Sequence, residues 1–232
     1  MFNHRTMTES AVLELRKAIL RGNYPSGTRL VPAKLENEFR LSKTAIREAI
    51  REIAGTNLVV SKTHKGACVA ESVPITEIRD IFDLRYQLEG KAAFLGAKHI
   101  SPDGIQQMEM LLEKMSEPMD RKRYADFLFN QRFHMILYRA SGWKYLTEVI
   151  NRLFDQVLLF RSGLYRQATE QELETILSWD NFKAYHQDHV DIMKGIQAGD
   201  CEGTRKAVVK NLKRGFQGLE ELLTYLKDRN EV

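Results

Sequence analysis

The sequence predicts a mainly α-helical protein with an N-terminal winged helix-turn-helix, residues 1–72, and a C-terminal all-α helical bundle, residues 73–232. Short helical patterns and one hairpin pattern fill the first region, whereas from Pro74 onward the apolar residues recur with the 3.6-residue period of a helix. The charge follows the same division. Residues 1–72 hold 12 Lys and Arg against 7 Asp and Glu, a net charge of +5, and residues 73–232 have a net charge of −1.

The composition is that of a folded globular chain. Of its 232 residues, 43% are hydrophobic and 28% are charged, so we expect a packed core rather than intrinsic disorder. No apolar run approaches the ~18 residues of a membrane span, and the start, MFNHRTMTES, lacks the apolar stretch of a signal peptide. The two cysteines, Cys68 and Cys201, suit a reducing compartment and lack zinc-ribbon spacing. We therefore expect a cytoplasmic protein.

The first region begins with a helix, a turn and a second helix. A helix is expected over residues 8–21, where Val12, Leu15 and Ile19 share one face. The following segment GNYPSGTRL contains the Gly and Pro residues that form turns. The short second helix then starts at Pro32, because proline is tolerated in the first turn of a helix.

A third helix follows after a brief connection. Ser42 can cap its start by accepting a backbone N–H bond. Ile46, Ile50 and Ile53 recur at i, i+4 and i+7, which gives the helix one apolar face. Two short helices joined by so short a turn predict a helix-turn-helix.

Two short β-prone runs, residues 58–61 and 67–70, flank a basic tip and predict a hairpin, which completes a winged helix. The outer side of the third helix is basic, and a DNA major groove is wide enough to admit a helix. We therefore expect the protein to bind double-stranded DNA at a palindromic operator. A solvated basic helix face is the alternative. The expected DNA contacts are Ser42, Lys43, Thr44, Arg47, Arg51, His64, Lys65 and Gly66.

The second region shows helical periodicity throughout and no strand-like alternation, which predicts a bundle with a buried interior. Breaks between helices are expected at the SP, EP, SGW and AGD sequences. The expected helices are residues 75–99, 102–115, 120–140, 144–165, 169–198 and 201–227.

The first region also resembles a known family. The stretch GTRLVPAKLENEFRLSKTAIREAIREIAGTNLVVSKTHKGACV is similar to the GntR-type winged helix. Lys43 and Lys65 stand where that family usually has arginine, and lysine keeps the charge but loses the bidentate fork. The matching residues are Gly27, Leu30, Leu35, Ser42, Thr44, Arg47, Glu48, Ala49, Leu58, Val59, Gly66 and Val69.

The second region resembles the FCD domain of the FadR-like branch of the same family. The segments IRDIFDLRYQLEGKAA, FNQRFHMILYRASG and HVDIMKGIQAGDCEGTRKAVVKNL carry this likeness. The resemblance implies a homodimeric transcription regulator whose operator affinity changes when a small-molecule effector binds in the bundle. It also favours a small carboxylate metabolite as that effector, or an acyl compound if the cavity is long and apolar.

Polar side chains interrupt the apolar faces of several helices in the second region. Because buried polar groups need partners, polar side chains on separate helices suggest a shared cavity. A guanidinium inside a bundle needs an anion, and for Arg85 this is either an effector or Glu89, one helical turn away. Histidines that simply bond to core neighbours are the alternative. The expected effector-binding residues are Arg85, Asn130, His134, Arg161, His189 and Asn211.

The resemblance further implies a divalent metal, zinc or nickel, bound in many FCD domains by one Asp and three His. Transferred to this chain, the Asp position is Asn130 and the His positions are His134, His189 and Asn211. His134 and His189 are therefore the remaining candidate ligands of an incomplete site. A neutral amide is a weak ligand for these ions, so the sequence disfavours a metal without excluding it.

Catalytic motifs are not visible in the sequence: it has no phosphate-binding loop, no paired-carboxylate motif and no nucleophile–base pair, so we do not expect an enzyme. Two other classes stay open. One is a helical metal- or ligand-binding protein with an accessory basic domain, and the other is an architectural protein that coats DNA with little sequence preference.

Overall fold

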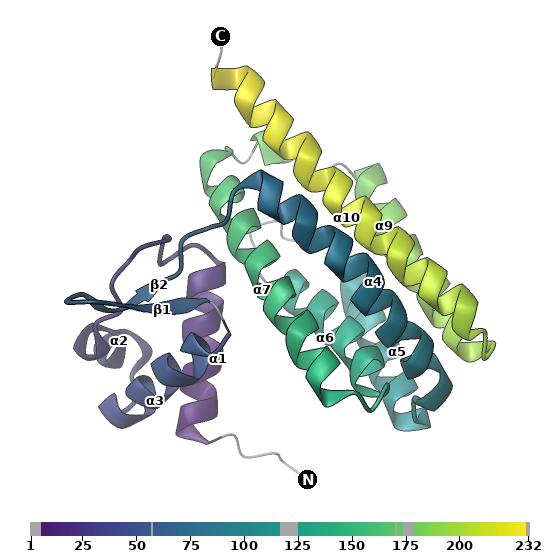
Figure 1. Cartoon of the computed structure of the whole chain (residues 1–232), viewed down its shortest axis with the longest axis horizontal. Helices are drawn as coiled ribbons and strands as arrows, with labels where there is room; N and C mark the ends of the chain where they lie inside the picture. Colours follow the sequence, from purple (N-terminus) through teal and green to yellow (C-terminus); the bar gives the residue numbers. More distant parts are fainter. Residues whose placement is uncertain (1–5, 57, 117–124, 170, 174–178, 231–232) are drawn as a thin grey trace. The chain divides into compact units, whose positions relative to one another are not determined.

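A computed structural model describes residues 6–56, 58–116, 125–169, 171–173 and 179–230 of the chain. The chain forms two compact units, which we describe separately (Figure 1). Unit 1 contains residues 1–74 together with residues 155–166, and unit 2 contains residues 75–154 and 167–232. The sequence-based boundary at residue 72 lies close to the break at residue 74. The association of residues 155–166 with unit 1 was not expected from the sequence.

Three helices form most of unit 1: α1 (Met7–Leu20), α2 (Pro32–Phe39) and α3 (Lys43–Ala54). Thr6 and Glu9 form a reciprocal capping box at the start of α1, and Pro32 occupies the first position of α2. The Oγ of Ser42 accepts a hydrogen bond from the backbone N–H of Ala45 at 3.2 Å, so the predicted cap of α3 is confirmed. The α3 helix packs against both α1 and α2.

A two-stranded antiparallel hairpin, β1 (Val59–Lys62) and β2 (Gly66–Val69), follows α3 (Figure 1). Val59 pairs with Val69, and Lys62 with Gly66. His64 at the tip adopts a left-handed backbone conformation with φ of 63°, which a residue with a Cβ adopts only at some cost. The predicted wing is confirmed, with each strand displaced by one residue from its expected range.

The core of unit 1 consists of the apolar faces predicted from the helical period. Leu15 and Ile19 of α1, Leu35 of α2 and Ile46 and Ile53 of α3 are all buried. Burying such side chains contributes about 1.5–3 kcal/mol each, which fixes α3 with its opposite side toward solvent.

Unit 1 also contains an ion pair that the sequence pattern did not indicate. Arg16 of α1 forms a bidentate pair with Asp155, whose side chain is fully buried. The two residues are 139 positions apart in the sequence, so helical periodicity within either segment carries no information about their contact.

Unit 2 is a bundle whose described helices include α4 (Ile75–His99), α5 (Pro102–Ser116), α6 (Ala125–Arg139), α7 (Lys144–Gln167), α9 (Trp179–Gln197) and α10 (Cys201–Asn230). In this bundle α10 lies alongside α4 and α9, and α6 packs against α4 and α5 (Figure 1). Several helices have boundaries within two residues of the predicted ones, and the predicted 75–99 helix is confirmed. The starts of the predicted 120–140 and 169–198 helices fall partly outside the described residues.

The core of unit 2 is rich in large side chains. Phe133, Leu137 and Tyr138 of α6 are fully buried, as are Met108 of α5 and Ile150 of α7. None of the described helices combines the length and apolar character needed to cross a membrane.

Candidate functional site

The predicted DNA-contact surface lies on the side of α3 opposite its buried isoleucines. Lys43, Thr44 and Arg47 are exposed, and none of them is held in an ion pair within the part of the chain that the structure describes. Ser42 is exposed too, although its hydroxyl oxygen is already used in the helix cap. The N-terminal end of α3 therefore presents two cations and a hydroxyl group to solvent.

The remaining predicted DNA-contact residues differ in how freely their side chains could contact DNA. Arg51 is exposed but forms an ion pair with Glu48 one turn earlier on α3. His64, Lys65 and Gly66 form the exposed tip of the wing. Gly66 has a φ of 72°, a left-handed conformation that glycine adopts without steric cost. The unit thus carries two separate basic elements, the start of α3 and the tip of the wing.

Five of the six polar residues predicted inside the bundle are buried, Arg161 being half-buried, and several of them are in contact. The Nε of Arg85 donates to Oε1 of Glu89 at 2.5 Å, and the hydroxyl of Tyr138 donates to Oε2 of Glu89 at 2.7 Å. The Tyr138 hydroxyl oxygen lies 3.2 Å from Nδ1 of His134. Arg85 is 4% exposed and also faces the rings of Phe82 and Phe154, at 4.8 and 5.1 Å.

A second group of contacts surrounds His189 of α9. Its Nδ1 lies 2.9 Å from the backbone carbonyl of Tyr185, and its Nε2 lies 2.7 Å from the side-chain amide of Asn130 on α6. The His134 and His189 rings are 5.2 Å apart between centroids. These contacts join α4, α6 and α9 through one buried polar cluster, which we define as Arg85, Glu89, Asn130, His134, Tyr138, His189 and Asn211.

Both imidazoles in the cluster are neutral near pH 7. Burial, together with His189 and the positive charge of Arg85, holds the pKa of His134 well below its usual value. Burial lowers the pKa of His189 to about 4. Burial and the nearby Glu89 raise the pKa of Tyr138 well above its usual value, so this hydroxyl keeps its proton.

Two polar atoms in the cluster lack partners of normal geometry. Among the described residues, Nε2 of His134 and Nδ2 of Asn211 are buried and make no hydrogen bond. Asn211 nevertheless lies close enough to His134 for its side chain to oppose the fall of the His134 pKa. An unsatisfied buried donor or acceptor costs about 1–3 kcal/mol, so two such atoms on neighbouring side chains need a physical explanation.

Arg161, the remaining predicted effector residue, lies in the segment of α7 that belongs to unit 1. The structure groups the other five predicted residues, Arg85, Asn130, His134, His189 and Asn211, in unit 2.

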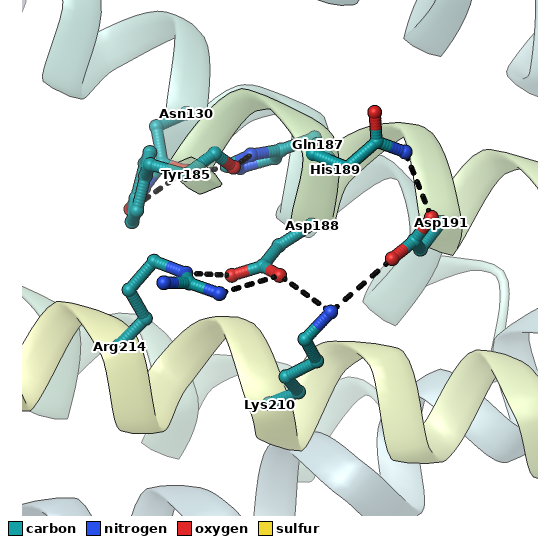
Figure 2. A network of polar contacts seen from close by, with 8 residues as sticks. All are labelled: Asn130, Tyr185, Gln187, Asp188, His189, Asp191, Lys210 and Arg214. Atoms are coloured by element: carbon teal, nitrogen blue, oxygen red, sulfur yellow. Dashed lines mark hydrogen bonds and ion pairs between the residues drawn. The ribbon is translucent and has the colours of Figure 1, made fainter. Parts of the chain in front are cut away.

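An ion-pair network beside His189 was not predicted. Asp188 is fully buried on α9 and accepts from Nε of Arg214 at 2.5 Å and from Nζ of Lys210 at 3.0 Å (Figure 2). Lys210 also reaches Asp191 at 3.3 Å. The sequence feature that could have predicted this network is the four-residue spacing of Lys210 and Arg214 on α10, opposite two acidic residues of α9. The network fastens α10 to α9 next to the polar cluster.

The comparisons with known proteins agree with this two-part arrangement. The family "Bacterial regulatory proteins, gntR family" matches residues 7–69, and the "FCD domain" family matches residues 80–214. The HTH-type transcriptional regulator McbR of Escherichia coli is 23% identical over 214 residues, covering 92% of each chain. The gluconate operon transcriptional repressor of Bacillus licheniformis is 26% identical over 212 residues, covering 89% of this chain and 81% of the repressor.

The fold is also shared with solved structures. The structure of E. coli McbR/YncC superposes with a TM-score of 0.74 at 21% identity, covering 95% of this chain and 99% of that one. The relatives named here are transcriptional regulators and not enzymes. With a GntR helix-turn-helix in its first part and an FCD domain over more than half of its length, the chain belongs to the GntR family of bacterial transcriptional regulators.

Proposed function

We propose that this regulator acts as a cytoplasmic homodimer that inserts the start of α3 into the DNA major groove at each half of a palindromic operator, and that an effector bound at the polar cluster changes its operator affinity. The observation that carries the DNA-binding part is the outward projection of Lys43, Thr44 and Arg47 from a helix whose opposite face is locked in the core. The wing tip supplies a second cationic element for the neighbouring DNA backbone.

Arg47 is the residue best suited to recognise a base. It lies one turn into α3 and is exposed, and a guanidinium can bond both N7 and O6 of a guanine. Lys43, closer to the helix start, presents a point charge that suits a phosphate. Sequence preference should therefore depend on Arg47 more than on Lys43.

Replacing Arg47 by alanine should weaken operator binding by about 1–3 kcal/mol, because a bidentate base contact is lost. The operator would be selected from random duplexes with the full-length protein, and affinity measured by fluorescence anisotropy. Arg132→Ala, which removes an exposed arginine from α6 of the bundle, is the matched control and should leave the affinity within about 0.5 kcal/mol. Unchanged affinity in the Arg47 variant would remove that residue from base recognition.

The two-fold symmetry of the proposed dimer determines how the two halves of its operator are arranged. A closed two-fold dimer presents two equivalent α3 helices, so each operator half should bear the same sequence in inverted orientation. The centres of the half-sites should then lie about one helical turn, roughly 10 base pairs, or a multiple of it apart.

The hydrogen bonding of Arg85 supports the proposal that the effector is an anion. Glu89 occupies its Nε, yet in the described part of the chain neither of its terminal Nη groups makes a hydrogen bond. The two Nη groups each supply one N–H to the fork that binds a carboxylate with two parallel hydrogen bonds. One relative named above is described as regulating a gluconate operon, and gluconate is a hydroxycarboxylate.

The effector proposal is tested with gluconate and a panel of small hydroxycarboxylates as probes. We expect one of them to raise the unfolding temperature of the wild-type protein and to change its operator affinity. Both effects should vanish in the Arg85→Met/Glu89→Leu double variant, which removes the guanidinium without leaving its partner carboxylate unpaired. An equal temperature shift in both proteins would show that the carboxylate binds elsewhere.

A further inference from the structure

The polar cluster contains the positions at which an FCD domain would hold zinc or nickel, but its donor set does not fit such an ion. The four side chains at those positions are two imidazoles and two amides, and they bring no negative charge. Within the described residues, no three or more His, Cys, Asp or Glu side chains are placed to hold a metal ion. Divalent zinc and nickel are held by imidazole, thiolate and carboxylate groups. Because two of the four positions carry neutral amides, only the two imidazoles are good ligands for these ions.

The proton positions in the cluster can be derived from its fixed contacts. The Tyr138 proton goes to Glu89, so the Tyr138 oxygen must accept from His134, and Nδ1 of His134 therefore carries the ring proton. The carbonyl of Tyr185 can only accept, so Nδ1 of His189 carries the proton of that ring. With the proton on Nδ1, Nε2 of each neutral imidazole is an acceptor lone pair.

Each of these lone pairs faces an amide group. Nε2 of His189 is 2.7 Å from Oδ1 of Asn130, which would place two acceptors face to face. The contact is favourable only with the Asn130 amide turned by half a rotation, so that its N–H donates to Nε2. Nε2 of His134 and Nδ2 of Asn211 are an acceptor and a donor on neighbouring side chains, and both are buried without another partner among the described residues. Turning the Asn211 amide by half a rotation would direct its N–H toward His134 and give both atoms a partner.

We propose that these two amides replace the metal ion. Asn130 donates to His189, and Asn211 donates to His134, so that α6 is joined to α9 and α10 by hydrogen bonds instead of by a shared cation. The arrangement keeps the three helices linked whatever the metal supply, and neither operator binding nor folding depends on zinc or nickel. This inference is independent of the effector proposal, because its readouts are metal affinity and ring protonation.

The first test restores the missing ligands in the full-length, untagged protein. After treatment with a chelator and its removal, calorimetry with Zn²⁺ and with Ni²⁺ should show binding to the Asn130→Asp/Asn211→His variant at least 100-fold tighter than to the wild type. Adding His134→Leu to that variant should abolish the gain. Wild-type binding within tenfold of the double variant would overturn the proposal, and so would a folded double variant that binds neither metal.

The second test needs no substitution and stands even if the double variant fails to fold. Long-range ¹H–¹⁵N correlation spectra of the wild-type protein with ¹⁵N-labelled histidine report which ring nitrogen is protonated. We expect the Nδ1–H form for both His134 and His189, with Nε2 shifted as a hydrogen-bonded acceptor and unaffected by added Zn²⁺. A proton on Nε2 of either ring would contradict the proposed amide donors.

Discussion

Replacing Glu89 by alanine is expected to lower the free energy of unfolding by about 3–5 kcal/mol, the largest effect of any substitution considered for this protein. Glu89 is fully buried and accepts from both Arg85 and Tyr138. Its removal leaves a guanidinium that is only 4% exposed without an ionic partner, and it deprives the Tyr138 hydroxyl of its acceptor. Urea denaturation followed by circular dichroism measures the loss.

The control for this prediction removes both charges. The Arg85→Met/Glu89→Leu variant should unfold within about 2 kcal/mol of the wild type, since paired buried charges can be exchanged for apolar groups at little cost. Both variants remove the acceptor of the Tyr138 hydroxyl, so the difference between them isolates the cost of the unpaired Arg85 charge. If Glu89→Ala cost no more than the double change, the pair would not be held in a buried, poorly solvated position.

Replacing Gly96 by alanine should destabilise the protein by about 3 kcal/mol, in the upper part of the range for overpacked cores. A Cβ at this position of α4 would lie 2.0 Å from the backbone carbonyl oxygen of Leu137 on α6. Backbone cannot rotate away as a side chain can, so the two helices must separate. The same urea titration measures the effect.

Gly218→Ala is the matched control for this substitution. Gly218 lies within α10, and a Cβ there would meet nothing within 4 Å. Alanine has the higher helix propensity, so this change should stabilise the protein by up to about 1 kcal/mol. Equal effects of the two substitutions would mean that α4 and α6 do not approach each other as closely as the structure shows.

Local sequence patterns predicted the elements of this fold well. The Ser42 cap, Pro32 at the start of α2 and the isoleucines of α3 are determined by groups within a few residues of one another. The same local logic located the 75–99 helix and identified Arg85 and His134 as inward-facing.

Partners on other elements were harder to predict. The contact of Tyr138 with Glu89 depends on the rotation of α6 against α4, and the Asp188 network depends on the register of α10 against α9. The ion pair of Arg16 with Asp155 joins segments 139 residues apart. Helical periodicity specifies which face of a helix is buried, but it does not specify the side chain that the face meets.

For the proposed effector to control DNA binding, it must distinguish two states of the protein. A ligand shifts operator affinity only by the difference between its affinities for the DNA-competent and the DNA-incompetent states. The polar cluster joins α4, α6 and α9 and lies beside the network that fastens α10, so a ligand at Arg85 would act on several helices at once.

If the start of α3 lies in the major groove as proposed, it will protect guanine N7 from methylation by dimethyl sulfate, and this protection is the most direct test. On an operator selected with the full-length protein, we expect protected guanines in two inverted half-sites about 10 base pairs apart or a multiple of it. In Arg47→Ala, the symmetry-related guanine of each half-site should become reactive while the remaining protection persists. Specific binding that leaves every guanine N7 as reactive as in free DNA would contradict the account.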